Sequence, residues 1–289
     1  MKKIMPKIIL AALALTLTTT CPAFAHHEAI FGPQASIMLS AGSYVSVQGF
    51  SRQTGTNTER KQETTGLIGF GFTPIPDIPV GINVIAPFSS ISELDKGGGK
   101  TGIEDVVIGL NYRYDLTDLN NKFGTTGNYI LGMSAIELTN GVIDHEAFQG
   151  PIDSMYALIG STQIGPFAGL LYGLLRHNAA DGVTKDKAGD NLYLGGGLTY
   201  SQPLEVINKD SSINFQLGMS YETYFADIVE GKTDNQSGGR GVLIHPTIIF
   251  LPGNNTQIFG LVSIPVWQSY ADPTGQDRFR VGAGVVYSF

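Results

Sequence analysis

Histidine beside serine is the first pair to look for, because histidine can act as the general base for a serine nucleophile. Two residues apart on a strand, such a pair would share one face. The residues two positions after the three internal histidines, His145, His177 and His245, are instead Ala147, Ala179 and Thr247. The spacing indicates no hydrolase, and we expect no catalytic residues, although a histidine and an acid from different strands can still converge.

Metal and phosphate chemistry are equally poorly supported. His26-His27-Glu28 carries metal-ligand types, but an exposed chain terminus is the favoured interpretation. Gly97-Gly98-Gly99-Lys100-Thr101 resembles part of a phosphate-binding loop, yet Leu94 stands where that pattern requires glycine. We therefore expect neither a bound metal nor another cofactor.

The N-terminus is typical of an export signal. Three lysines precede an apolar stretch over 8–17, which is too short to span a bilayer as a helix. Ala23-Phe24-Ala25 fits the small-x-small pattern that signal peptidase cuts, so cleavage after Ala25 is predicted. The only cysteine, Cys21, would be removed, leaving no thiol for a disulfide or a metal. The predicted parts are a signal peptide at 1–25, an N-terminal periplasmic or lumen-entering segment at 26–42, and a barrel at 43–289.

Charge excludes one class of partner. The chain has 18 basic and 25 acidic side chains, and loss of the three signal lysines makes the balance more acidic. Nucleic-acid binding requires clustered basic residues, so we expect no nucleic acid as a partner. Charged residues are only 15% of the chain while glycine reaches 37 residues. Soluble domains commonly carry about 25% charge, so this composition favours a membrane barrel.

Hydrophobicity alternates with period two along the chain, which predicts strands with one apolar face. In the last twelve residues, one face carries Phe279, Val281, Ala283, Val285, Tyr287 and Phe289. Runs of about ten residues are long enough for a tilted strand to cross hydrocarbon. Twelve such strands are predicted, at 43–51, 62–72, 78–87, 102–115, 127–138, 153–164, 167–178, 190–201, 213–226, 240–251, 256–268 and 278–289.

The predicted connections alternate between long polar links and shorter turns, as in bacterial outer-membrane barrels with both termini in the periplasm. The fold class is therefore all-β: a transmembrane antiparallel up-and-down β-barrel whose outer wall contacts outer-membrane lipid. A secreted soluble β-protein is the alternative. It would have to bury twelve apolar strand faces in a second layer.

Side chains opposite the apolar rows would line the interior of such a barrel. The candidates for a lumen or solute pathway are Asp105, Asn111, Arg113, Gln216, Glu222, His245, Gln257, Phe259, Trp267 and Arg280. The charged members either pair across a narrow lumen as structural groups or contact a solute. Phe259 and Trp267 would make an apolar inner strip that suits hydrophobic or aromatic solutes, unless a bulge switches their faces.

Two stretches resemble a known family. Gly102-Ile103-Glu104-Asp105 with the run 109–114, and Ile264-Pro265-Val266-Trp267-Gln268 with Tyr287-Ser288-Phe289, are similar to outer-membrane proteins grouped as the MetA pathway of phenol degradation. Trp267 and Asp277 depart from that pattern. The resemblance implies a barrel that moves aromatic or other hydrophobic compounds. Phe289 also resembles the terminal residue by which the barrel-assembly machinery recognises its clients.

Three functions remain open from the sequence. The favoured one is a channel or transporter in the cell outer membrane for passive passage of small solutes, hydrophobic or aromatic ones among them. The alternatives are an outer-membrane enzyme acting on lipid or peptide, revealed by a histidine that reaches a serine or carboxylate near one rim, and a plugged barrel with a structural or interaction role.

Overall fold

The computed structural model describes residues 43–74, 79–116, 126–138, 152–180, 186–207, 209–253 and 255–289. The predicted signal peptide, its cleavage site at Ala25 and the segment 26–42 lie outside the described residues, and these calls stay predictions. No helix among the described residues is long and apolar enough to cross a membrane.

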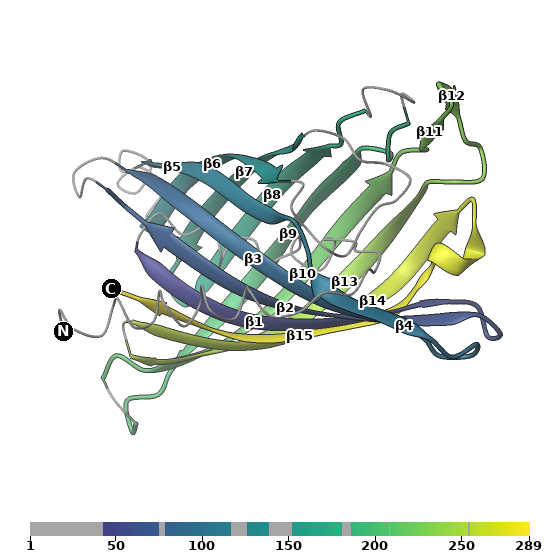
Figure 1. The fold of residues 1–289 in the computed structure, drawn as a ribbon. Coiled ribbons are helices and arrows are strands. Elements are labelled where there is room, and N and C mark those ends of the chain that lie inside the picture. The colour runs from purple at the N-terminus through teal and green to yellow at the C-terminus, as the bar shows by residue number, and fades with distance from the viewer. Residues whose placement is uncertain are drawn as a thin grey trace.

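Twelve antiparallel strands close into a barrel, as predicted (Figure 1). Each strand pairs with its neighbours in sequence, β1 pairs with β15, and the β2–β3 pairing completes the circle. The strands are β1 (Tyr44–Gly55), β2 (Arg60–Phe72), β3 (Val80–Glu93), β4 (Gly99–Ile103), β5 (Val106–Asp115), β6 (Thr126–Leu138), β7 (Ile152–Ile164), β8 (Phe167–His177), β9 (Asn191–Pro203), β10 (Ser212–Tyr224), β13 (Gly239–Gly253), β14 (Thr256–Tyr270) and β15 (Asp277–Ser288).

One predicted strand is divided. The segment predicted at 102–115 forms β4 and β5, which both pair with β3 and together count as one of the twelve. Several strands also extend beyond the predicted ends, most clearly β1, which reaches Gly55, and β3, which reaches Glu93. A strand pair β11 (Ile228–Val229) and β12 (Lys232–Thr233) and a 3₁₀ turn η2 (Pro273–Gly275) lie in the connections.

The two ends of the barrel differ. Strand β15 ends beside the start of β1, where the Phe289 N–H donates to the Ser43 carbonyl. The hairpins that join β1 to β2, β3 to β4 and β14 to β15 lie at the opposite end (Figure 1). We call these the terminus end and the loop end.

Apolar side chains cover the outer wall. Leu171 and Leu198 are each 73% exposed, and Leu217 is 61% exposed. The alternate residues in each strand point inward and are largely buried. Among the described residues, the only other sheet is the short pair β11–β12, so no second sheet in this part of the chain covers these rows. The outer wall is therefore apolar in the way that a hydrocarbon environment requires.

Glycine makes room inside the barrel for large side chains on the neighbouring strand. Tyr44, which is fully buried, lies over Gly71, and Tyr270 lies over Gly239. Phe50 packs against Gly282 in the same manner. Such cross-strand pairs of an aromatic ring with a glycine hold the register of a curved sheet.

We expect Gly71→Ala to destabilise the barrel by about 1–3 kcal/mol, because the added methyl group would overlap the Tyr44 ring in a packed site. Gly132→Ala is the matched control, since nothing lies within 4 Å of a Cβ at that position. Urea unfolding followed by tryptophan fluorescence would measure both variants. Equal midpoints for the two would contradict the packing role of Gly71.

Candidate functional site

A bulge near the start of β15 shapes the polar interior. The register between β1 and β15 shifts after Gln53 pairs with Phe279, and Thr54 then pairs with Asp277. Arg278 is the extra residue and is exposed. Because of this irregularity, Asp277 lies on the same inner side as Arg280, and both side chains are buried.

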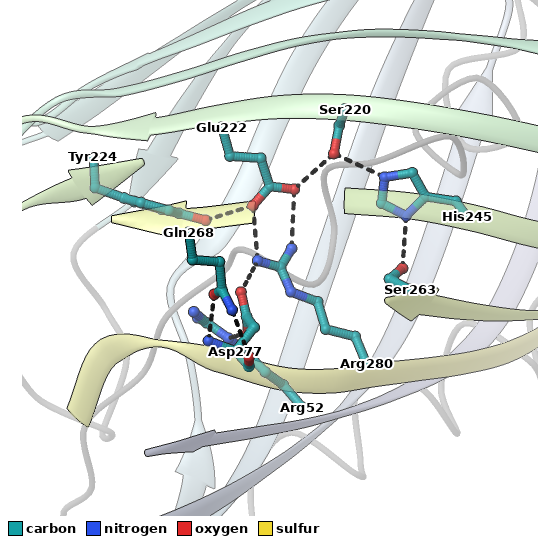
Figure 2. A network of polar contacts seen from close by, with 9 residues as sticks. All are labelled: Arg52, Ser220, Glu222, Tyr224, His245, Ser263, Gln268, Asp277 and Arg280. Carbon is teal, nitrogen blue, oxygen red and sulfur yellow. Dashed lines mark hydrogen bonds and ion pairs between the residues drawn. The ribbon is translucent and has the colours of Figure 1, made fainter. Parts of the chain in front are cut away.

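Four charged groups of alternating sign form a chain inside the barrel (Figure 2). Arg52 Nε lies 2.5 Å from Asp277 Oδ1, and Asp277 Oδ2 lies 2.6 Å from Arg280 Nη2. Arg280 also donates to both Glu222 oxygens, at 3.1 and 2.7 Å. Arg52 and Arg280 lie directly opposite each other in β1 and β15, where like charges repel, so Asp277 offsets that repulsion. We call these four residues the ion chain.

Neutral groups extend the ion chain in two directions. The Tyr224 hydroxyl donates to Glu222 Oε2 at 2.8 Å, and the Gln268 side chain bonds both the N–H and the carbonyl of Asp277. On the other side, Ser220 Oγ lies 3.1 Å from Glu222 Oε1 and 2.7 Å from His245 Nε2.

His245 also contacts a second serine, with its Nδ1 lying 2.7 Å from Ser263 Oγ (Figure 2). A serine hydroxyl carries one proton. All three contacts are satisfied when Ser220 donates to Glu222, His245 Nε2–H donates to Ser220, and Ser263 donates to Nδ1. In this arrangement the Ser220 proton is directed at Glu222, so His245 does not act as its base.

A second ion cluster lies between β6, β7 and β8. Arg176 Nη2 is 2.9 Å from Glu137 Oε2 and 3.1 Å from Asp153 Oδ2. Asp153 Oδ1 also accepts the Ala179 N–H at 2.7 Å. The three buried arginines, Arg52, Arg176 and Arg280, are thus each paired with carboxylates inside the barrel.

Three tyrosines connect these regions at the loop end. The Tyr193 and Tyr224 ring centroids are 6.0 Å apart and nearly perpendicular, and those of Tyr224 and Tyr270 are 5.9 Å apart. We call Tyr193, Tyr224 and Tyr270 the tyrosine arc. Tyr193 is buried, whereas Tyr224 and Tyr270 are partly exposed beside the ion chain.

Asp190 holds together the residues of the loop between β8 and β9 through several hydrogen bonds and ion pairs. It accepts from Lys187 Nζ at 2.9 Å, contacts the His177 ring at 3.1 Å and accepts the Asn178 N–H at 3.0 Å. Burial raises the pKa of the Asp190 carboxyl, but the hydrogen bonds from Lys187, His177 and Asn178 outweigh burial and hold its pKa below the ordinary value. The carboxylate therefore stays charged and keeps this loop against the barrel rim.

The ion chain and the neutral groups bonded to it bring together three of the predicted residues, Glu222, His245 and Arg280. Asn111, Gln216 and Phe259 are also buried on the inner side but lie outside that network. Gln257 is partly buried near the start of β14. Whether any of them contacts a solute stays a prediction.

Two predicted residues lie less deeply than expected. Asp105 lies in the break between β4 and β5 and is only partly buried, while its neighbour Glu104 is fully buried. Arg113 is partly exposed. Its Nε lies 2.8 Å from Asp115 Oδ1, and its Cζ lies 4.4 Å from the centroid of the Tyr129 ring. Before the break at 104–105 the even-numbered residues point inward, and after it the odd-numbered residues do.

The inward placement predicted for Trp267 is wrong. The register between β13 and β14 shifts so that Val242 pairs with Trp267 and Leu243 pairs with Pro265, which leaves Val266 as the extra residue. This bulge turns Trp267 to the outer side, where it is 46% exposed and lies 5.6 Å below the Arg240 guanidinium.

Several members of the network are absent from the sequence-based candidates. They are Arg52, Ser220, Tyr224, Ser263, Gln268, Asp277 and the second-cluster residues Glu137, Asp153 and Arg176. Alternation in β10 was a usable signal for Ser220, because it shares a face with Glu222. Arg52 was missed because the predicted first strand ended at residue 51. No group of three or more potential metal-ligating side chains occurs in the part of the chain that the structure describes.

No family model and no curated protein matches this chain. Among solved structures, it is similar to the COG4313 outer membrane channel from Pseudomonas putida F1, with 12% identity, a TM-score of 0.66, and coverage of 87% of this chain and 97% of that one. The beta domain of the Bordetella autotransporter BrkA is 12% identical with a TM-score of 0.52, covering 86% and 100%. At these identities the likeness shows a shared outer-membrane barrel fold, and membership of the MetA family stays a prediction.

Proposed function

We propose that this protein is an outer-membrane channel for passive passage of small solutes. The observation that carries the proposal is the polar and aromatic inner face of a closed barrel whose outer wall is apolar. Such a wall is stable in lipid, and an inner face with ions, hydroxyls and rings can contact a solute. The likeness of the fold to an outer membrane channel supports this reading.

The proposed location is the cell outer membrane, with the terminus end in the periplasm and the loop end outside. The export signal predicted to end at Ala25 supports this location. Phe289 would be read by the barrel-assembly machinery before insertion, and outer-membrane lipid would contact the exposed apolar rows.

Uncharged solutes with aromatic or other apolar parts are the proposed cargo. In the ion chain, Arg52 and Arg280 are matched by Asp277 and Glu222, so these four residues offer an anion no excess positive charge. Tyr224 and Tyr270, the partly exposed members of the tyrosine arc, offer aromatic surface to an aromatic solute. The resemblance of the sequence to the MetA group supports the same class.

Planar-bilayer recording of the purified protein tests the channel. We expect discrete conductance steps with weak selectivity between cations and anions, and faster swelling of protein-containing liposomes in neutral solutes than in anionic ones of similar size. Protein-free liposomes are the control. Absence of conductance and of swelling with every probe would contradict the channel and support the plugged barrel.

An enzyme is the second candidate, because His245 lies within hydrogen-bonding reach of Ser220 and Ser263. The hydrogen-bond arrangement derived above opposes it, since the Ser220 proton is directed at Glu222. Assays with phospholipid and peptide substrates would decide. Hydrolysis that is lost in both Ser220→Ala and His245→Ala would replace the channel proposal with an esterase or protease.

A further inference from the structure

Near the terminus end, the inner face carries polar atoms that have no hydrogen-bond partner in the protein. Gln48 is 3% exposed, and neither its Oε1 nor its Nε2 is paired. Ser46 Oγ and Asn83 Nδ2 are likewise buried and unpaired. An unpaired buried amide or hydroxyl costs roughly 1–3 kcal/mol, so such groups normally meet a partner. We call Ser46, Gln48 and Asn83 the neutral patch.

The neutral patch is held by its neighbours. Tyr44 lies across Gly71, and its hydroxyl donates to Asn83 Oδ1 at 2.9 Å, which fixes the amide so that Nδ2 is left to donate. Ser46 and Gln48 follow Tyr44 at alternate positions of β1, so the three share the inner face. A buried, oriented set of this kind is preformed for a ligand.

Glycine at position 284 lets the Phe259 and Gln48 side chains pack close to the β15 backbone. A Cβ at Gly284 would lie 2.7 Å from Phe259 Cε1 and 2.8 Å from Gln48 Cγ. The Phe259 ring and the Gln48 side chain therefore meet over Gly284, which pairs with both residues across β14 and β15 and across β1 and β15. An apolar ring stands directly beside the unpaired amide.

No charged side chain adjoins the neutral patch among the described inward residues of β1, β2, β3, β14 and β15. The described inward residues there are Tyr44, Phe50, Leu67, Gly69, Gly71, Gly81, Ile85, Gln257, Leu261, Gly282 and Val286, together with the patch, Phe259 and Gly284. The ion chain lies closer to the loop end, where Arg52 of β1 is opposite Arg280 of β15 in the strand register. A charged ligand would lose hydration at the patch without gaining a counter-charge.

The geometry points to a binding subsite for an uncharged solute that carries several hydroxyl or amide groups on an apolar or ring-shaped body. Gln48 supplies the N–H groups of Nε2 as donors and Oε1 as an acceptor, Ser46 a hydroxyl that can do either, and Asn83 the N–H groups of Nδ2 as donors. The Phe259 ring contacts the apolar face of the solute. This subsite rests on the proposed channel, since a solute reaches it only through the lumen.

Gln48→Leu tests the subsite, with a neutral monosaccharide, glucose, as the probe and gluconate as its anionic counterpart. We expect ligand-observed NMR on the purified barrel in detergent to detect glucose binding and to detect weaker or no gluconate binding. Loss of two neutral hydrogen bonds in Gln48→Leu should weaken glucose binding about tenfold. Gln163→Leu, the same change at an exposed position of β7 outside the patch, should bind glucose as the natural protein does.

A second measurement separates a binding role from a structural one. Because Gln48 has no partner in the protein, its replacement by leucine should leave the urea midpoint of unfolding unchanged or raise it. A lower midpoint than that of the natural protein would overturn the proposal, as would unchanged glucose binding in Gln48→Leu or no glucose binding by the natural protein. Binding is measured without flux, so a barrel that binds glucose but does not conduct would contradict only the channel.

Discussion

Leu217→Arg is expected to destabilise the barrel in lipid by about 2–4 kcal/mol. Leu217 lies at the middle of β10, is 61% exposed, and points away from the interior that contains its neighbour Gln216. In lipid, an arginine at this depth must either leave water or distort the bilayer. In a protein whose outer wall faced water, the same change would be nearly neutral. Reversible urea unfolding in phospholipid vesicles gives the difference directly.

Ile213→Arg is the matched control, because residue 213 lies on the same face of the same strand close to the terminus end. The cost of a lipid-facing charge falls to about 0–1 kcal/mol near the membrane interface. A large effect at 217 with a small one at 213 would measure the depth of the strand in lipid. Equal small effects at both positions would contradict a membrane-spanning wall.

The alternation that makes Leu217 testable is also what made the fold predictable. In β10 and β15 the side chains that the sequence assigns to the outer face are the exposed ones, Phe215, Leu217 and Met219 in the first case and Phe279, Val281 and Val285 in the second. A strand in lipid must present one apolar and one different face over its whole length, so the local pattern and the global fold agree. The strand count follows from the same repeat.

Local breaks in the pairing register could not be predicted in this way. A single extra residue exchanges inner and outer faces for the remainder of a strand, and nothing in the residue types at Val266 or Arg278 identifies them as bulges. This explains both the wrong face for Trp267 and the absence of Asp277 from the predicted interior. Glu222 and Arg280 are 58 residues apart in the sequence. Their ion pair likewise depends on the closed barrel, and local sequence does not indicate it.

Arg280→Gln is expected to have the largest effect on stability, a loss of about 3–5 kcal/mol, because it removes the guanidinium that neutralises two buried carboxylates. Arg280 bridges Glu222 at 2.7 Å and Asp277 at 2.6 Å, and both carboxylates are almost completely buried. Unfolding of the protein in detergent by guanidinium chloride would measure the loss in the free energy of unfolding. Arg113→Gln is the control. The pair of Arg113 with Asp115 is largely exposed, so its loss should cost no more than about 1 kcal/mol.

A double-mutant cycle with Glu222→Gln distinguishes the charge pair from simple loss of packing. If Arg280 acts mainly by neutralising Glu222, the double variant should be less destabilised than the sum of the two single variants, because neither member is then left as an uncompensated buried charge. Asp277 would still be paired with Arg52 at 2.5 Å, which limits the damage to one half of the ion chain. Additive effects would mean that Glu222 and Arg280 contribute independently. The ion chain would then be a set of separate contacts, and balanced pairing would no longer explain an inner face without a charge preference.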